Sequence, residues 1–264
     1  MEHAVQDLYR SQVKALQQGY RRFLELIPQI SGTRLFLAVL SGTIAIIWLS
    51  AWSHNAVVGY GYGAILFSAI SWPFVPRLAR HLFWPRHLLT KSVAILMLSI
   101  LTGSLGDLIL GRNPQAAGLS QFNWTIAKKL LWQFPLVLPV ENLLLIGAMV
   151  AFIRLVQVKT TTQAVTGAIL AAFFFGLWHV PFWGWGTLLT IGLTVVPWTL
   201  YMMLTGDVLV PVVAHVMMDG LAMLSNFAPN AVVRQGSLLW LVLAALVWNA
   251  LKSWWHDHHV IVRE

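Results

Sequence analysis

Long apolar stretches fill most of this chain, and short polar stretches separate them. From Leu35 onward the apolar runs reach about 20 residues with few charges, which is the length that an α-helix needs to cross a bilayer. We expect eight such helices, at about 35–53, 56–76, 89–110, 130–153, 164–182, 185–204, 208–227 and 236–255. The pattern therefore predicts an all-α, polytopic membrane protein with about eight transmembrane helices.

The first 34 residues follow a different pattern. Between residues 3 and 28, apolar side chains recur at helical spacing, with Arg10, Lys14, Arg21 and Arg22 among them. This is typical of an amphipathic helix on an anionic membrane surface, and a solvated lead-in helix fits it equally well. We divide the chain into a cytoplasmic N-terminal segment, a transmembrane domain and a tail, at 1–34, 35–255 and 256–264.

The composition agrees with a membrane protein. Charged residues make up 10% of the chain and the mean hydropathy is +0.72, whereas a soluble domain contains about 25% charged residues. The basic residues that give the net charge of +8 flank the apolar runs. Contact with anionic lipid and orientation in the membrane explain them, so we expect no nucleic-acid partner. Cysteine is absent from the sequence, which excludes disulfides and thiol nucleophiles.

The basic residues also predict an orientation. If the N-terminus is cytoplasmic, most of the 17 lysines and arginines face the cytoplasm, and the exceptions are Arg112, Lys128, Lys129 and Arg234. Cytoplasmic segments are enriched in these residues. We therefore expect a multi-pass protein of the plasma membrane, or of the inner membrane in a bacterium, with both termini in the cytoplasm.

An ionisable side chain at the centre of a span costs about 2.5–3.5 kcal/mol. Apart from charged residues near the span ends, the membrane interior holds a short list: Glu141, His179, His215 and Asp219. His215 and Asp219 are four residues apart and share one helix face. His179 lies nearer the end of its span than the others. A carboxylate with imidazoles can activate water, the same residues can hold a divalent metal, and a polar cluster can join helices or carry protons.

Other polar and aromatic residues near the span ends have simpler explanations. Asp207 is expected to begin the helix at 208–227, stabilised by the helix dipole, and Asp107 to make a local polar contact. Trp178 and Trp183 are expected as anchors at the membrane interface, with the lining of a substrate entrance as the alternative. Phe175, one turn from His179, is more simply explained as a helix contact than as a site residue.

The sequences around the ionisable residues resemble the motifs of one protease family. They are Pro139–Gly147, Phe175–Pro181 and Pro211–Asp219. In order and spacing they are similar to Glu-Glu-x-x-x-Arg-Gly, Phe-x-x-x-His and His-x-x-x-Asn/Asp of the CAAX-protease and bacteriocin-processing family (Abi, or CPBP). The resemblance covers about residues 130–227.

This resemblance implies an intramembrane endopeptidase that acts on a membrane-associated protein or peptide in the lipid bilayer. It implies that Glu141 activates the attacking water with help from His179. His215 and Asp219 would stabilise the oxyanion or assist the water. The resemblance implies either no cofactor or a divalent metal such as zinc, held by the same four residues.

Two positions depart from the first motif, because Asn142 replaces its second glutamate and Ile146 replaces its arginine. If these two form an ion pair in the family, losing both together can be nearly neutral. An inactive family member that acts as a membrane scaffold or self-immunity factor is therefore one alternative. A proton-coupled transporter is another, although we find no inverted repeat. The motifs of site-2, rhomboid and presenilin-type proteases are absent from the sequence.

Overall fold

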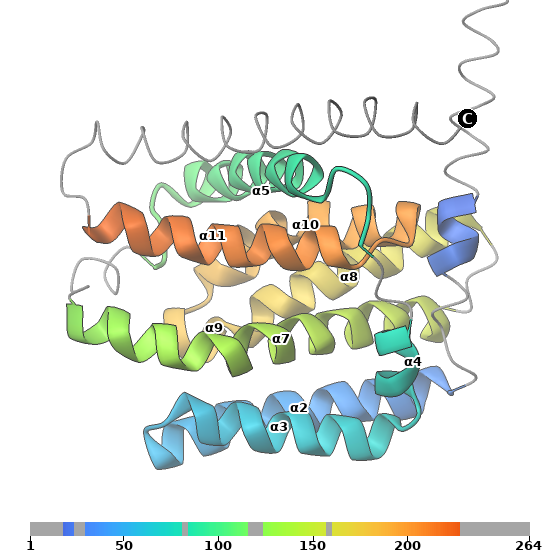
Figure 1. Ribbon diagram of the computed structural model, residues 1–264, viewed down its shortest axis with the longest axis horizontal. Helices are drawn as coiled ribbons and strands as arrows, with labels where there is room; N and C mark the ends of the chain where they lie inside the picture. Colours follow the sequence, from blue (N-terminus) through green and yellow to red (C-terminus); the bar gives the residue numbers. More distant parts are fainter. Residues whose placement is uncertain (1–17, 24–29, 81–83, 116–123, 157–159, 228–264) are drawn as a thin grey trace, which may run out of the picture.

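The computed structural model describes residues 18–23, 30–80, 84–115, 124–156 and 160–227, and all regular structure in these ranges is helical (Figure 1). The predicted all-α fold is therefore confirmed for them. The helices are α2 Gly32–Ser53, α3 Ala56–Ser71, α4 Phe74–Arg80, α5 Leu88–Leu110, α7 Trp124–Leu155, α8 Thr161–Trp178, α9 Val180–Trp183, α10 Gly186–Thr205 and α11 Leu209–Phe227.

Within the described ranges, five segments are long and apolar enough to cross a membrane, namely Gly32–Ser53, Leu88–Leu110, Trp132–Leu155, Thr162–Trp183 and Gly186–Thr205. Ala56–Ser71 and Leu209–Ala222 are apolar but shorter. The protein is therefore an integral membrane protein of several spans. The expected total of eight stays a prediction, since the span at 236–255 lies outside the described residues.

One expected element differs from the observed one, and another lies mostly outside the described residues. The span expected at 56–76 ends at Ser71 and is followed by the short helix α4, because Pro73 has no amide hydrogen and disfavours a helical Trp72. The amphipathic helix expected at 3–28 lies mostly outside the described residues. Its described part, 18–23, is helical, and Gly19 lies directly against the backbone at the end of α10.

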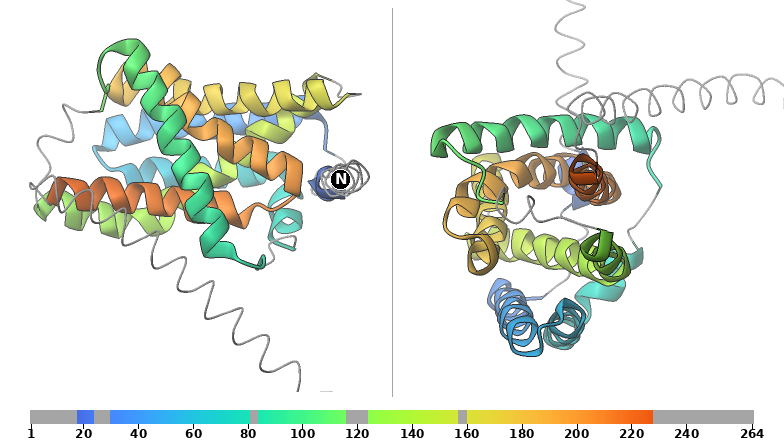
Figure 2. Two further views of the ribbon diagram at one scale, coloured as in Figure 1. Left: turned by 90° about the horizontal axis from the view of Figure 1, so that it is seen from above. Right: turned by 90° about the vertical axis from the view of Figure 1, so that its left-hand side faces the viewer.

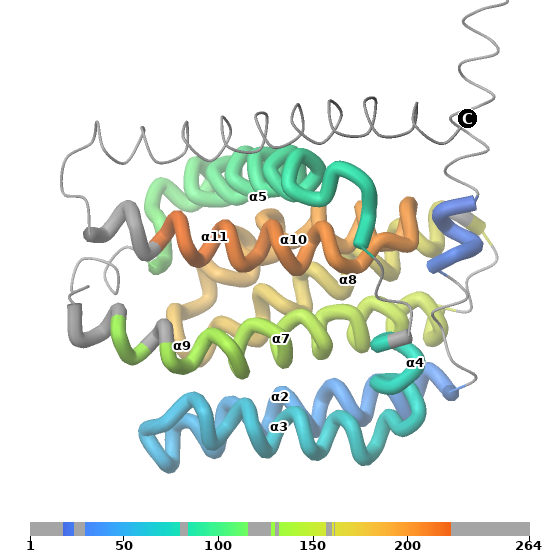
Figure 3. Tube along the Cα trace, viewed as in Figure 1, coloured from blue at the N-terminus to red at the C-terminus, as the bar shows by residue number. Residues whose placement is uncertain are grey.

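The helices pack in layers around α7. Figure 1 shows α2 and α3 side by side below α7, with α11 and α5 above it, and Figure 2 shows α5 crossing the other helices at a steep angle. The chain path in Figure 3 places α8 and α10 behind this stack. In α7, 72% of the most apolar stretch is buried, compared with 33–44% in the other four long segments. The polar side chains of Gln133, Glu141 and Asn142 on α7 are buried as well.

The contact between α8 and α10 depends on a glycine. At Gly176 an added Cβ would lie 2.8 Å from three backbone atoms of α10, those of Thr187, Leu188 and Gly192. Backbone atoms cannot move aside as a flexible side chain can, so any larger residue at this position forces the two helices apart. Small residues allow this close approach between membrane helices.

We expect Gly176→Ala to destabilise the protein by about 1–3 kcal/mol, the usual cost of overpacking. Gly61→Ala is the matched control, because an added Cβ at Gly61 meets nothing within 4 Å. Alanine is also the better helix former, so this control is expected to be neutral or slightly stabilising. Thermal unfolding in detergent, followed by tryptophan fluorescence, measures both. Equal midpoints for the two variants would contradict the packing argument.

Candidate active site

Glu141 is a buried carboxylate in the middle layer of the protein. It follows Pro139 in α7 and is 7% exposed. The hydroxyl of Tyr60, from α3, donates a hydrogen bond to Glu141 Oε1 at 2.5 Å. This leaves Oε2 as the carboxylate oxygen that faces the rest of the site.

His215 and Asp219 lie on one face of α11, as their spacing predicted. Nε2 of His215 is 3.6 Å from Glu141 Oε2 and 3.9 Å from Asp219 Oδ2. Both distances are within ion-pair range and longer than a hydrogen bond. The imidazole of His215 therefore lies between two carboxylates and makes a hydrogen bond to neither.

His179 joins the same site from the end of α8. Its Nδ1 lies 2.8 Å from the carbonyl oxygen of Phe175, one turn earlier. The Phe175 ring contacts both imidazoles, with centroids 4.7 Å from His179 and 6.1 Å from His215. The two imidazoles are close enough to interact electrostatically. All four sequence-predicted residues thus belong to one cluster, although His179 lies at a helix end.

Aromatic rings surround the imidazoles. The ring of Trp198, from α10, lies near His215 with centroids 4.7 Å apart. Phe175 was expected to make only a helix contact, but its ring also lies against both imidazoles. Trp178 was expected at the membrane interface, and this expectation is wrong, because it is only 3% exposed and its ring contacts that of Tyr60. It lies three residues after Phe175, so both face the same side of α8. Trp183 is exposed, as expected.

Asn142 also belongs to the site. Its Nδ2 donates to the Leu138 carbonyl at 2.7 Å and lies 3.1 Å from His215 Nδ1. Ile146 is buried in the apolar core, so the position of the missing arginine leaves no unpaired charge. The two departures from the family motif are therefore both accommodated by this fold.

The two acids outside the cluster make local contacts. Asp207 begins α11, where its Oδ1 accepts a hydrogen bond from the Val210 amide at 3.4 Å. Burial raises the pKa of the Asp207 carboxyl, and hydrogen bonds from the helix amides oppose that rise. Asp107 Oδ2 accepts from Asn113 Nδ2 at 3.0 Å. Both contacts agree with the expectations from the sequence.

The metal-binding alternative for the four residues stays a prediction. Among the residues described, no three or more His, Cys, Asp and Glu side chains converge as a metal-binding group. Tyr60 occupies one oxygen of Glu141, and the Phe175 carbonyl occupies Nδ1 of His179.

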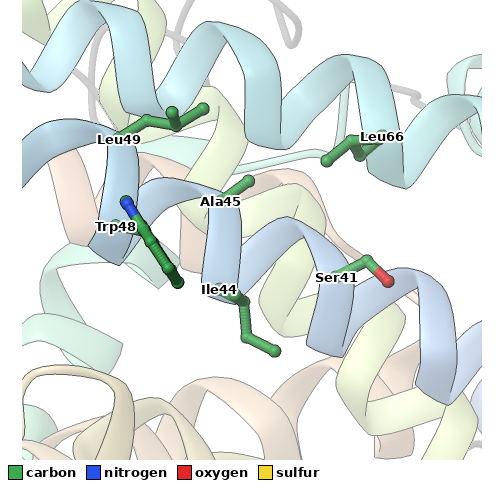
Figure 4. A pocket seen from close by; sticks show the side chains of 6 residues that line it. All are labelled: Ser41, Ile44, Ala45, Trp48, Leu49 and Leu66. Carbon is green, nitrogen blue, oxygen red and sulfur yellow. The ribbon is translucent and has the colours of Figure 1, made fainter. Parts of the chain in front are cut away.

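A cavity of about 400 Å³ lies elsewhere, between α2 and α3 (Figure 4). It is lined by Ser41, Ile44, Ala45, Trp48, Leu49 and Leu66. None of the site residues reaches it, and its walls are mostly apolar. It is not part of the candidate active site.

The fold and the cluster define a helical membrane protein in which two carboxylates and two imidazoles lie together among the helices. Residues 123–221 match the Rce1-like family, described as type II CAAX prenyl endopeptidase Rce1-like. This match covers less than half of the chain, agrees with the resemblance of the three motifs to the CPBP family, and holds all four ionisable residues. No curated protein and no solved structure matches the chain.

Tyr60 was missed by the sequence analysis because it lies outside that stretch. The available signal is the glycine that precedes it. Gly59 lies against the Ser50 side chain and the Ile46 carbonyl of α2, and small residues mark packed faces of membrane helices. That signal indicates a buried face of α3, but it does not indicate that Tyr60 on this face binds the carboxylate of Glu141.

Proposed function

We propose that the protein is an intramembrane endopeptidase that hydrolyses a peptide bond of a membrane-associated protein or peptide. The observation that carries this proposal is the buried Glu141, which has one oxygen bound by Tyr60 and the other 3.6 Å from His215. The match of residues 123–221 to a family of CAAX-type endopeptidases supports the same reaction class.

In the first step Glu141 Oε2 acts as the general base. It takes a proton from water, and the water oxygen attacks the carbonyl carbon of the substrate peptide bond. The Phe175 carbonyl can only accept a hydrogen bond, so the His179 nitrogen that faces it carries a proton. The other nitrogen, Nε2 of His179, then has a lone pair that can accept a hydrogen bond from the same water.

The second step needs a donor for the oxygen that becomes negative. An ionised Asp219 can only accept hydrogen bonds, so we assign stabilisation of the oxyanion to His215 and orientation of His215 to Asp219. When the carbon–nitrogen bond breaks, Glu141 returns its proton to the leaving amine. The products are a carboxylic acid and an amine, and the enzyme returns to its starting state.

The test is a mass-spectrometric survey of new protein termini in membranes from cells that carry the wild type, Glu141→Gln or Asp107→Asn at matched expression. Asp107→Asn is the control, because it removes the same charge outside the cluster. Termini present with the wild type and the control but absent with Glu141→Gln would support a protease and identify its substrate. Identical surveys would contradict the proposal and favour a scaffold, a self-immunity factor or a transporter.

Tyr60→Phe is expected to lower kcat/KM by about tenfold and to lower the unfolding temperature. Hydrogen bonds to charged groups contribute about 1.5–3 kcal/mol, and loss of this one leaves a buried oxygen of Glu141 without its donor. Tyr62→Phe is the control, because Tyr62 lies on the same helix but is 56% exposed. Initial rates and thermal unfolding measure the pair. Equal rates for both variants would exclude a role of the Tyr60 hydroxyl.

A further inference from the structure

We infer that Asn142 is a positioning residue, which holds His215 in the tautomer that carries its proton on Nε2. The two side chains meet across the contact between α7 and α11, and both are buried. The inference about the tautomer stands on hydrogen-bond geometry alone. Its catalytic consequence rests on the proposed function.

The orientation of the Asn142 amide follows from its other partner. Nδ2 lies 2.7 Å from the backbone carbonyl of Leu138. A carbonyl oxygen only accepts hydrogen bonds, so the amide group that faces it is the NH₂ and not the oxygen. An NH₂ group has two hydrogens. One is directed to Leu138, and the second is directed to His215 Nδ1 at 3.1 Å.

The protonation of the imidazole follows in turn. A ring nitrogen that accepts a hydrogen bond has a lone pair, so the ring proton of His215 is on Nε2. That N–H points toward Glu141 Oε2 and Asp219 Oδ2, at 3.6 and 3.9 Å. Neither distance is a hydrogen bond, so this N–H is not committed to either carboxylate and can donate to an oxygen that comes closer.

The two imidazoles of the site are therefore held in opposite tautomers. His179 donates from Nδ1 to the Phe175 carbonyl and keeps a lone pair on Nε2, whereas His215 accepts at Nδ1 and donates from Nε2. One imidazole accepts hydrogen bonds in the site and the other donates them. This division suits the two steps proposed above, which need an acceptor for water and a donor for the oxyanion.

The residue type at position 142 decides which tautomer forms. A carboxylate there, as in the Glu-Glu motif that this chain resembles, can only accept, so it would place a proton on Nδ1 of His215. An amide whose NH₂ donates to Nδ1 of His215 instead requires a lone pair on that nitrogen. The departure at Asn142 therefore makes His215 a donor through Nε2 without a second buried charge.

The test is nitrogen NMR of the full chain, labelled with ¹⁵N-histidine and placed in lipid bilayers. The nitrogen shift distinguishes a ring nitrogen with a lone pair from one with a proton, and His215 is assigned by the signals that His215→Gln removes. We expect a lone pair on Nδ1 in the wild type and loss of that signal in Asn142→Asp. Asn55→Asp is the control and leaves it unchanged, since Asn55 caps α3 and aspartate caps equally well.

A protonated Nδ1 in the wild type, or an unchanged signal in Asn142→Asp, would overturn the inference. If Asn142→Asp does not fold, Asn142→Leu serves instead. Leucine neither donates nor accepts, so both tautomers are expected where the wild type has one. A single unchanged tautomer in Asn142→Leu would equally overturn the inference.

The kinetic readout separates this inference from the proposed function. Loss of an oxyanion donor costs about 100- to 1,000-fold in kcat, so we expect a loss in that range for Asn142→Asp with KM little changed. A chain that hydrolyses nothing but has the stated tautomer would refute the protease and keep the inference. A chain that cleaves its substrate but carries a proton on Nδ1 of His215 would support the protease and overturn the inference.

Discussion

Replacing Glu141 by glutamine is expected to lower kcat/KM by about 100- to 10,000-fold, the range in which a general base contributes. Glutamine has nearly the same shape, and its side-chain oxygen still accepts the hydrogen bond of Tyr60. It cannot take a proton from water. The loss therefore isolates proton transfer from packing.

The measurement is the initial rate of the purified chain in liposomes, on a substrate found by the survey of termini. Asp107→Asn, the same type of change outside the cluster, is expected to cleave like the wild type. Both variants are first shown to unfold at the wild-type temperature. A Glu141→Gln variant that keeps its rate would remove Glu141 from the mechanism.

His215→Leu has the second largest expected effect, a fall in kcat of about 100- to 1,000-fold from loss of the donor to the oxyanion. Leucine fills much of the space between Trp198 and the two carboxylates but has no N–H. KM is expected to change little, because the donor acts on charge that develops only in the transition state. Progress curves at several substrate concentrations separate kcat from KM.

His215→Gln is the matched comparison, because glutamine retains a donor. It is expected to recover part of the rate that His215→Leu loses. Equal losses in the two variants would indicate that His215 acts through packing against Trp198 and Phe175 rather than as a donor.

The polar cluster could be predicted from the sequence because charged groups in a membrane are costly and few. Glu141, His215 and Asp219 were found on that ground, and helical periodicity correctly placed the last two on one face. The spans of α5 and α10 followed from their unbroken apolar runs. The end of α3 was misplaced because the local effect of Pro73 outweighed an apolar pattern that continued beyond it.

The partners of the cluster could not be predicted in the same way. Tyr60 and Glu141 are separated by 81 positions in the chain, and tyrosine near a span end is common at membrane interfaces. Asn142 drew attention only as a departure from a motif. Its role depends on which helix packs against that side of α7, and this is a property of the tertiary structure.

The hydrogen bond from α3 has a consequence for where the functional unit of this protein begins. The segment that matches the family model, residues 123–221, contains Glu141 and both imidazoles, but a hydroxyl that binds Glu141 comes from a hairpin some sixty residues upstream in the printed sequence. A chimera that joins this segment to the hairpin of another protein would therefore keep Glu141 and both imidazoles but lose the hydrogen bond from Tyr60. The smallest transplantable form of the site is the segment together with that hairpin.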